Sequence, residues 1–343
     1  MDSITHLFLG GAVAAAIAPA KHRRAALLAG AALNTLPDLD SLFIALFTDD
    51  PVSLMTVHRS FSHSLFVLPV LGWLIWWLFR MRGKRVAEAP LRWFWAIQLA
   101  LATHPLLDAF TVYGTQLWWP LHTPPVMGSS LFIIDPSYTV GLLAACVFAW
   151  FARAESKGQR ALLAGLVLST AYLAWSLLAK SLIERQADRD LAAMGLQSAP
   201  RFSVPMPFNT LLWRVVAMTP DGYVIADRSL VADRGAMHFE GYKSNTQALA
   251  EAQRIEAVRR LAWFNRGFMR AQVVGDELVL SDLRMGLEPD YNFRFAVAAR
   301  EGGQWEAIPP RQLQAAYRAP VASGKLKAAL NQLWRRIWHQ PEA

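Results

Sequence analysis

The segment HRSFSHS (58–64) places two histidines, an arginine and three serines directly before fifteen residues without a charge. His58 and His63 are five residues apart and do not share a face of one straight helix, so they need a loop or a helix entrance. Each could be a metal ligand or a hydrogen-bonded interface residue. Arg59 lies between them, and its planar guanidinium suits a phosphate, although a salt bridge to Asp38 or Asp40 is an equally open role.

The segment THPLLD (103–108) carries a second candidate pair. His104 and Asp108 are four residues apart, so on a helix both side chains project from one face. The pair could bind one cation, or Asp108 could simply orient His104. Pro105 would remove one backbone hydrogen bond and kink this helix, a distortion often found beside a site.

Three more candidates lie at the ends of earlier apolar segments. NTLPDLD carries Asp38 and Asp40 in a predicted turn, and capping of the following helix is the alternative role of Asp40. ITHL begins the first apolar segment with His6. Alone, none of these residues specifies a metal site.

Together, these groups predict one. The candidates include three carboxylates and four histidines, with one arginine and no lysine. Carboxylates so close to one another would repel each other without a cation. Imidazole and carboxylate form the ligand set of zinc, and also of manganese or iron. We predict a site for one or two divalent ions, with zinc as the first expectation. Its predicted ligands are His6, Asp38, His58, His104 and Asp108, with Asp40 and His63 as further ligands or as residues that orient them.

This ligand set also predicts a chemistry. A metal ion lowers the pKa of bound water and polarises a phosphoryl or carbonyl oxygen. Arg59 is the only fixed positive charge in the loops 37–63 and 111–130. We therefore predict metal-assisted hydrolysis of a phosphoester, in which Arg59 stabilises the anionic substrate or its transition state. The predicted catalytic residues are Arg59, Asp40 and His63. A serine–histidine nucleophile is disfavoured, because no G-x-S-x-G motif surrounds the serines.

Long uncharged runs in the first 180 residues predict the elements that hold the site. A membrane-spanning helix needs ~20 mostly apolar residues, and the chain is 54% hydrophobic. The stretches that meet or approach this length are 64–79, 93–110, 131–152 and 161–179, with 7–20 and 25–36 as shorter spans or a packed hairpin. We predict a mostly α-helical protein with a polytopic transmembrane bundle over residues 1–180, in contact with the lipid bilayer. The buried core of a soluble helical protein is the alternative.

Basic residues predict the orientation of this bundle. The segments 21–24, 80–92 and 153–160 hold 11 of the 13 Lys and Arg residues of residues 1–180. Counted alternately along the chain, all three lie on one side, which the positive-inside rule makes cytoplasmic. The candidate ligands lie at the opposite ends of their segments. The site is therefore predicted to face outward, where a phospholipid is one candidate substrate.

The rest of the chain has ordinary mixed composition. Residues 181–208 are predicted to form an amphipathic helix and a proline-marked linker, and residues 209–343 an extracytoplasmic α+β domain. The predicted elements of this domain are strands at 212–218, 223–231 and 292–299, a hairpin over 271–283, and helices over 245–262 and 325–338. The last helix is expected on a membrane surface or docked onto its own domain. Basic residues are spread over both halves of the chain, so no nucleic-acid partner is expected; the sequence identifies no protein partner.

The motifs THLFLGGAVAAA, GAALNTLPDLDSL, HRSFSHSLF and THPLLDAFTVYGTQLWWPL resemble, in this order, those of the membrane-embedded YdjM-like family, described as metal-dependent hydrolases. The resemblance covers about residues 3–150 and implies a bacterial inner-membrane protein. That family is similar in its helical core and metal ligands to zinc-dependent phospholipase C.

The similarity to phospholipase C implies roles for individual residues. His104 and Asp108 match its HxxxD ligand pair, Asp38 a bridging aspartate, His58 or His63 a further ligand, and His6 a histidine of the N-terminal region. The later HxxxE of the phospholipases is absent after Asp108, although His122 could take its place. The missing ligand favours a site with one or two metal ions over a site with three.

Two other classes of function stay open at this stage. A transporter would use the same ligands as a transit site, but it would want ionisable residues on both sides of the membrane midplane, and these are not evident. A non-catalytic scaffold would hold a structural metal. A closed coordination shell would favour the scaffold, and an open coordination position would favour hydrolysis.

Overall fold

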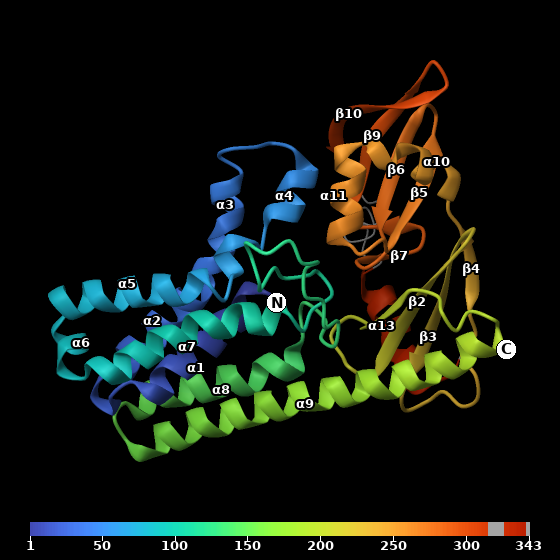
Figure 1. The fold of residues 1–343 in the computed structure, drawn as a ribbon. Helices are drawn as coiled ribbons and strands as arrows, with labels where there is room; N and C mark the ends of the chain where they lie inside the picture. Colours follow the sequence, from blue (N-terminus) through green and yellow to red (C-terminus); the bar gives the residue numbers. More distant parts are fainter. Residues whose placement is uncertain (315–325, 341–343) are drawn as a thin grey trace. The chain divides into compact units, whose positions relative to one another are not determined.

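The structure, a computed structural model, describes residues 1–314 and 326–340 and divides into two compact units (Figure 1). Unit 1 comprises Met1–Phe47, Val57–Leu177 and Pro207–Asn209. Unit 2 comprises Thr48–Thr56, Leu178–Met206 and Thr210–Ala343.

Unit 1 is helical, and it contains every candidate site residue. Its longer helices are α1 (Ser3–Ile17), α2 (Arg23–Thr35), α5 (Val67–Arg82), α7 (Pro90–Asp108), α8 (Pro136–Ala152) and the first part of α9 (Ser156–Ala193). The short helices are η1 (Ala20–His22), η2 (Leu36–Leu39), α3 (Asp40–Ile44), η3 (Phe61–His63) and α6 (Lys84–Glu88), with α4 (Pro51–Val57) at the unit boundary. Buried apolar residues of α1, α2, α7 and α8 form its main core.

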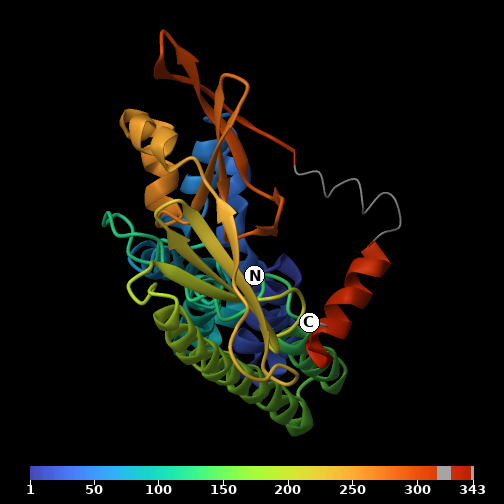
Figure 2. The same ribbon diagram turned by 90° about the vertical axis from the view of Figure 1, so that its right-hand side faces the viewer.

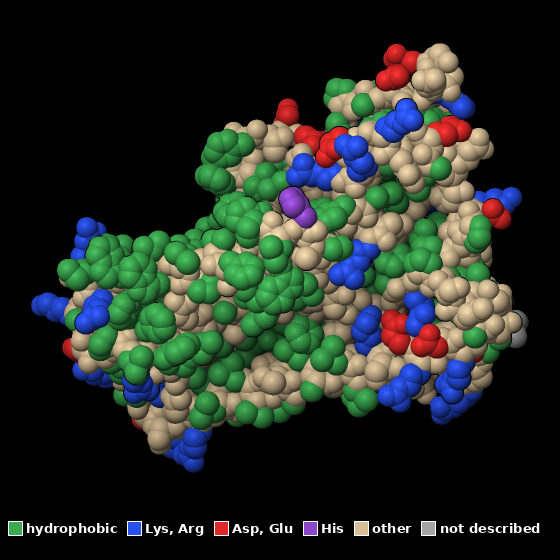
Figure 3. All heavy atoms as spheres, viewed as in Figure 1, with side chains coloured by type: hydrophobic (Ala, Val, Ile, Leu, Met, Phe, Trp, Pro, Cys, Tyr) green, Lys and Arg blue, Asp and Glu red, His purple; other side chains and the backbone are tan. Residues whose placement is uncertain are grey.

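Few helices of unit 1 are both long and apolar enough to span a membrane. Among the described residues, α9 alone is long and apolar enough to cross a membrane, and the segments Pro51–His63 and Val67–Arg82 pass the same test together across a 56° bend. Helices α1 and α8 are apolar but shorter. Only 22% of the apolar stretch of α9 is buried, unlike the core helix of a soluble protein. Hydrophobic side chains also cover much of the surface over α5 and α7 (Figure 3).

Helix α9 differs from the sequence prediction, which placed a span over 161–179 and a separate helix from 181. The structure has one helix of 38 residues, Ser156–Ala193. No proline occurs in this stretch, so nothing removes a backbone hydrogen bond where the composition changes from apolar to charged. The sequence prediction placed a break where the composition changes, but a change in composition alone does not end a helix.

The three basic segments meet at one end of unit 1. Glu88 of α6 accepts from Lys21 Nζ at 2.6 Å and from His22 Nε2 at 2.9 Å. Arg23 donates to the main-chain carbonyls of Arg153 and Glu155. These contacts join the loops before α2, α7 and α9, as the predicted topology requires.

Unit 2 contains two four-stranded antiparallel sheets, which Figure 2 shows from the side. The first has the order β1 (Arg201–Pro205), β2 (Leu212–Thr219), β3 (Gly222–Ser229) and β4 (Glu240–Lys243). The second has the order β10 (Gln304–Gln312), β9 (Arg294–Glu301), β6 (Glu277–Asp282) and β5 (Met269–Val274). The remaining elements are α10 (Thr246–Glu251), η4 (Ala252–Arg254), α11 (Glu256–Phe264), β7 (Gly286–Leu287), β8 (Asp290–Tyr291) and α13 (Leu326–Trp338). Ile337 of α13 is buried against Met206 and Leu212, so this helix docks on its own unit.

Five strands of unit 2 fall where the sequence predicted none, namely β1, β4, β7, β8 and β10, and two of these, β1 and β10, contain prolines. The expected linker 200–208 contains β1, and β10 spans a segment with two adjacent prolines. Both are edge strands. An edge strand tolerates proline because one side of its backbone needs no partner.

Glycines bring α1 and α2 into close contact. A Cβ atom on Gly30 would lie 2.1 Å from the Gly10 carbonyl oxygen and 2.5 Å from Ala14 Cβ, and one on Gly10 would lie 2.2 Å from Asn34 Cβ. Small residues of this kind let helix backbones approach within a membrane bundle. The contact places Asn34 of α2 against His6 of α1, beside the site.

We expect Gly30→Ala to destabilise the protein by about 1–3 kcal/mol, because the added methyl group overlaps the α1 backbone. Gly141→Ala in α8 is the matched control, since a Cβ at that position meets no atom within 4 Å. It should be neutral or stabilising. Thermal unfolding in detergent measures both, and equal unfolding temperatures for the two variants would contradict the packing described here.

Candidate metal centre

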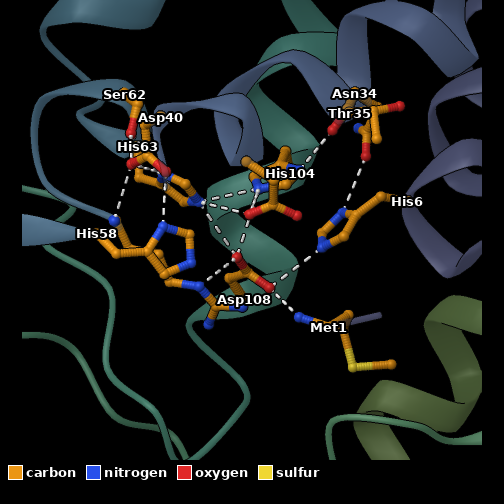
Figure 4. Close-up of polar contacts among 12 residues, drawn as sticks. Met1, His6, Asn34, Thr35, Asp40, His58, Ser62, His63, His104 and Asp108 are labelled. Atoms are coloured by element: carbon orange, nitrogen blue, oxygen red, sulfur yellow. Dashed lines mark hydrogen bonds and ion pairs between the residues drawn. The ribbon is translucent and has the colours of Figure 1, made fainter. Parts of the chain in front are cut away.

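Four side chains converge inside unit 1 (Figure 4). Asp38 comes from η2, His63 from η3, and His104 and Asp108 from the end of α7. One ligand atom of each lies within 4.8 Å of those of the other three. The side chains of His63, His104 and Asp108 are fully buried, and that of Asp38 is 18% exposed. We refer to these four residues as the ligand group.

The facing atoms of the ligand group are two nitrogens and two oxygens. His63 Nε2 and His104 Nε2 lie 3.5 and 3.4 Å from Asp38 Oδ1, and both lie 3.4 Å from Asp108 Oδ2. The two nitrogens are 2.9 Å apart. Both oxygens are buried and have no hydrogen-bond partner among the described residues. Buried carboxylate oxygens without a hydrogen bond are costly. The ion pair of Asp108 Oδ2 with Arg59 Nε, at 3.2 Å, offsets part of this cost, and a cation among the four atoms would offset the rest.

The hydrogen bond at Nδ1 sets the tautomer of His104. Its Nδ1 faces the main-chain carbonyl oxygen of Asn34, which can only accept. Nδ1 therefore carries a proton, and in the neutral imidazole Nε2 carries a lone pair that faces the centre of the group. A ligating histidine typically donates its other N–H to a carbonyl in this way.

Two hydrogen bonds in series set the same tautomer for His63. His63 Nδ1 lies 2.9 Å from Ser62 Oγ, and the Ser62 hydroxyl donates to Asp40 Oδ2. Because that carboxylate accepts the hydroxyl proton, Ser62 Oγ accepts from His63 Nδ1–H. The Nε2 lone pair of His63 then also faces inward.

A divalent cation fits this set of atoms better than a proton does. A proton shared by the two Nε2 atoms would leave Asp38 Oδ1 without a hydrogen bond and Asp108 Oδ2 with only its ion pair to Arg59. Four ligand atoms placed tetrahedrally at the ~2.0–2.1 Å typical of zinc would be roughly 3.3–3.4 Å apart. The nitrogen–oxygen distances of 3.4–3.5 Å match this value, whereas the two nitrogens, 2.9 Å apart, would have to separate.

His6 lies beside the ligand group and outside it. Its Nδ1 is 3.0 Å from Asn34 Oδ1, and its Nε2 is 3.2 Å from Asp108 Oδ1, the oxygen that points away from the other three ligands. The same oxygen accepts from the Met1 amino group. The His6 ring stacks on that of His104 at 3.8 Å between centroids. His6 therefore fixes the positions of two ligands from the far side.

His58 and Asp40 form a separate pair that holds the HRSFSHS loop. His58 Nδ1 lies 2.6 Å from Asp40 Oδ1, while Asp40 Oδ2 accepts from the main-chain N–H of Arg59 at 3.0 Å and from Ser62. Arg59 has a positive φ of 64°, a conformation that needs such support. Burial alone would raise the pKa of Asp40, but its hydrogen bonds to His58 and Ser62 outweigh burial and hold that pKa below its ordinary value.

The loop held by Asp40 places the Arg59 guanidinium against the ligand group. Arg59 Nε lies 3.2 Å from Asp108 Oδ2, and Nη1 donates to Thr111 Oγ1 at 3.4 Å. The guanidinium also stacks over the Tyr113 ring, 4.9 Å from its centroid. Arg59 is buried, so its positive charge acts on the site with little screening by water.

The structure therefore places some of the predicted site residues in the ligand group and others outside it. Asp38, His104 and Asp108 lie together with His63, whereas His6 and His58 lie outside the ligand group. Arg59 pairs with Asp108 in place of the expected partners Asp38 and Asp40. Asn34 and Ser62, to which the sequence assigned no site role, orient the two histidines. The only signal for them is their location within the NTLPDLD and HRSFSHS motifs.

The family model of the YdjM inner membrane proteins matches residues 1–183, just over half of the chain and the whole ligand group. No curated protein and no solved structure matches the chain.

We expect His63→Gln and His104→Gln each to lose a bound metal ion, because each removes one nitrogen that faces the centre of the group. Asp40→Asn should weaken metal binding about 10–100-fold, as the loss of an orienting group does. His122→Gln is the matched control, since His122 is exposed and outside the group. Elemental analysis of detergent-purified protein gives the metal content of each variant. Wild-type occupancy in a folded His63→Gln variant would exclude this ligand set.

Proposed function

The chain belongs to the YdjM inner membrane protein family, and on that premise we propose that it is a membrane-bound, metal-dependent hydrolase of a phosphoester. One observation carries the proposal: a buried guanidinium lies 3.2 Å from a carboxylate of the ligand group. A structural metal is satisfied by its ligands alone, and a neighbouring cation weakens its binding. Arg59 is therefore best explained by an anion that binds beside the metal.

Each residue of the site has a role in this proposal. A bound divalent cation supplies a water of lowered pKa and polarises a phosphoryl oxygen. Asn34 and Ser62 keep the lone pairs of His104 and His63 directed inward. Asp40 holds the loop that presents Arg59. The Arg59 guanidinium, fixed by Asp108, Thr111 and Tyr113, donates to the anionic oxygens of the substrate and stabilises the charge that develops in the transition state.

Asp38 marks the side from which the substrate reaches the site. It is the only partly exposed member of the ligand group. Exposed apolar side chains surround it along the chain: Leu36, Leu39, Leu42, Phe43, Leu46 and Phe47. An apolar rim beside a metal and an arginine suits a phosphoester carried by a lipid, so a phospholipid is the first substrate class to test.

A second candidate is a non-catalytic scaffold with a structural metal. The observation in its favour is that four protein ligands, three of them fully buried, can close a tetrahedral shell. Removal of the metal separates the two functions. A structural ion would stabilise the fold without any turnover, whereas a catalytic ion would restore turnover when added back.

We expect Arg59→Gln to retain the metal and to lose about 10²–10³-fold in kcat, the usual effect of removing one donor to a transition-state anion. Arg59→Lys should recover part of this loss. Hydrolysis is measured with bis(4-nitrophenyl) phosphate and with phospholipid micelles, and metal content is measured on the same samples. Lys157→Gln removes a charge at the opposite end of unit 1 and is the control. Wild-type turnover in Arg59→Gln would exclude the proposed role, and a metal-loaded wild type without turnover on any phosphoester would leave the scaffold function.

We also propose that unit 1 crosses the membrane several times with its basic end in the cytoplasm. The contacts of Glu88 and Arg23 that join the basic segments support this orientation, because clustered Lys and Arg residues stay on the cytoplasmic side. The ligand group and unit 2 would then be extracytoplasmic.

Labelling of single cysteines tests this orientation. In a Cys146→Ser background, a membrane-impermeant thiol reagent added to spheroplasts should label His122→Cys and leave Lys157→Cys unlabelled. Both positions are exposed, so the difference would report the side of the membrane. Labelling of Lys157→Cys in preference to His122→Cys would reverse the orientation.

A further inference from the structure

An apolar cavity lies between α2, α5, α6 and α7, at the basic end of unit 1. Its volume is about 530 Å³, within the range of small-molecule sites. Its walls include Ala29 and Leu33 of α2, Ile75 and Phe79 of α5, and Trp93 and Ile97 of α7. No residue of the ligand group lines this cavity, so the cavity is distinct from the candidate metal centre.

One wall of the cavity carries a hydrogen-bond donor without an acceptor. Trp93 is 5% exposed, and its indole Nε1 is buried with no partner among the described residues. A buried tryptophan N–H normally finds an acceptor. By comparison, Trp76 Nε1 donates to the Pro90 carbonyl oxygen at 2.8 Å. Because Nε1 has no accessible surface, this donor is closed off from the cavity, and Trp93 contributes only its ring to the wall.

The rim of the cavity is basic. Lys84 and Arg85 line it, both are exposed, and neither has an ion pair within the described part of the chain. The nearest acid along the chain, Glu88, is already engaged by Lys21 and His22. The rim therefore presents positive charge that its own neighbours do not neutralise.

We propose that this cavity binds one anionic phospholipid, with an acyl chain between α2, α5 and α7 and the phosphate at Lys84 and Arg85. The apolar walls match an acyl chain. Basic pockets between membrane helices on the cytoplasmic side bind anionic headgroups in this manner. The assignment is independent of the proposed hydrolase activity.

Native mass spectrometry of the detergent-purified protein tests the proposal, with phosphatidylglycerol and phosphatidylcholine as probes. We expect one phosphatidylglycerol per chain, bound more tightly than phosphatidylcholine. Lys84→Gln/Arg85→Gln should weaken phosphatidylglycerol binding by about 30-fold, the expected loss for two basic residues at an anionic surface, and should leave phosphatidylcholine binding unchanged.

Two further variants serve as controls for this test. Lys157→Gln/Arg160→Gln removes the same charge at the same end of unit 1, away from the cavity, and should have no effect. Ala32→Phe fills the exposed side of the cavity and should prevent binding of both lipids. Equal binding of the two lipids by the wild type, or an equal loss in the control double variant, would overturn the proposal. Thermal unfolding in detergent, measured on the same samples, shows whether each variant is folded.

Discussion

The interior of unit 1 contains two nitrogens and two carboxylate oxygens that face one another, with the Arg59 guanidinium beside one of the oxygens, and this electrostatic constraint governs the rest of the site. Buried carboxylates are tolerated only when their charge is compensated. The surrounding groups act on the opposite side of each ligand: the Asn34 carbonyl and the Ser62 hydroxyl bind the two Nδ1 atoms, and His6 binds the outer oxygen of Asp108. All of these contacts keep lone pairs directed toward the shared centre.

The same constraint explains why α1 and α2 pack so closely. Asn34 supplies its carbonyl oxygen to His104 and its side chain to His6, so it must lie between α1 and α7. The backbone contact of Gly10 with Gly30 leaves Asn34 in that position. A feature that looks like ordinary helix packing in a membrane bundle is thus part of how a ligand is oriented.

Much of this arrangement follows from the sequence, and the rest does not. The four-residue spacing of His104 and Asp108 predicted their shared helix face, and the four motifs predicted the family, which the family match confirms. The choice between His58 and His63 could not be predicted. It depends on the positive φ of Arg59 and on Asp40, which holds this loop from 18 to 22 residues away in sequence. In unit 2, the prolines of β1 and β10 argued against strands in these segments. Proline is tolerated in an edge strand, but sequence alone does not show which strand lies at an edge.

The distribution of charge links the fold of unit 1 to its chemistry. The loops 37–63 and 111–130 contain no lysine and one arginine, whereas the opposite end of the unit collects the basic segments. Excess positive charge near the ligand group would compete with a metal ion, so its exclusion favours cation binding. The Met1 amino group, which contacts Asp108, and Arg59 are exceptions to that exclusion. Arg59 is buried, and Asp40, Thr111 and Tyr113 all hold it or its loop in place. In the function we propose, a guanidinium kept at such cost beside the ligand group is explained by an anionic substrate that needs both the metal and the arginine.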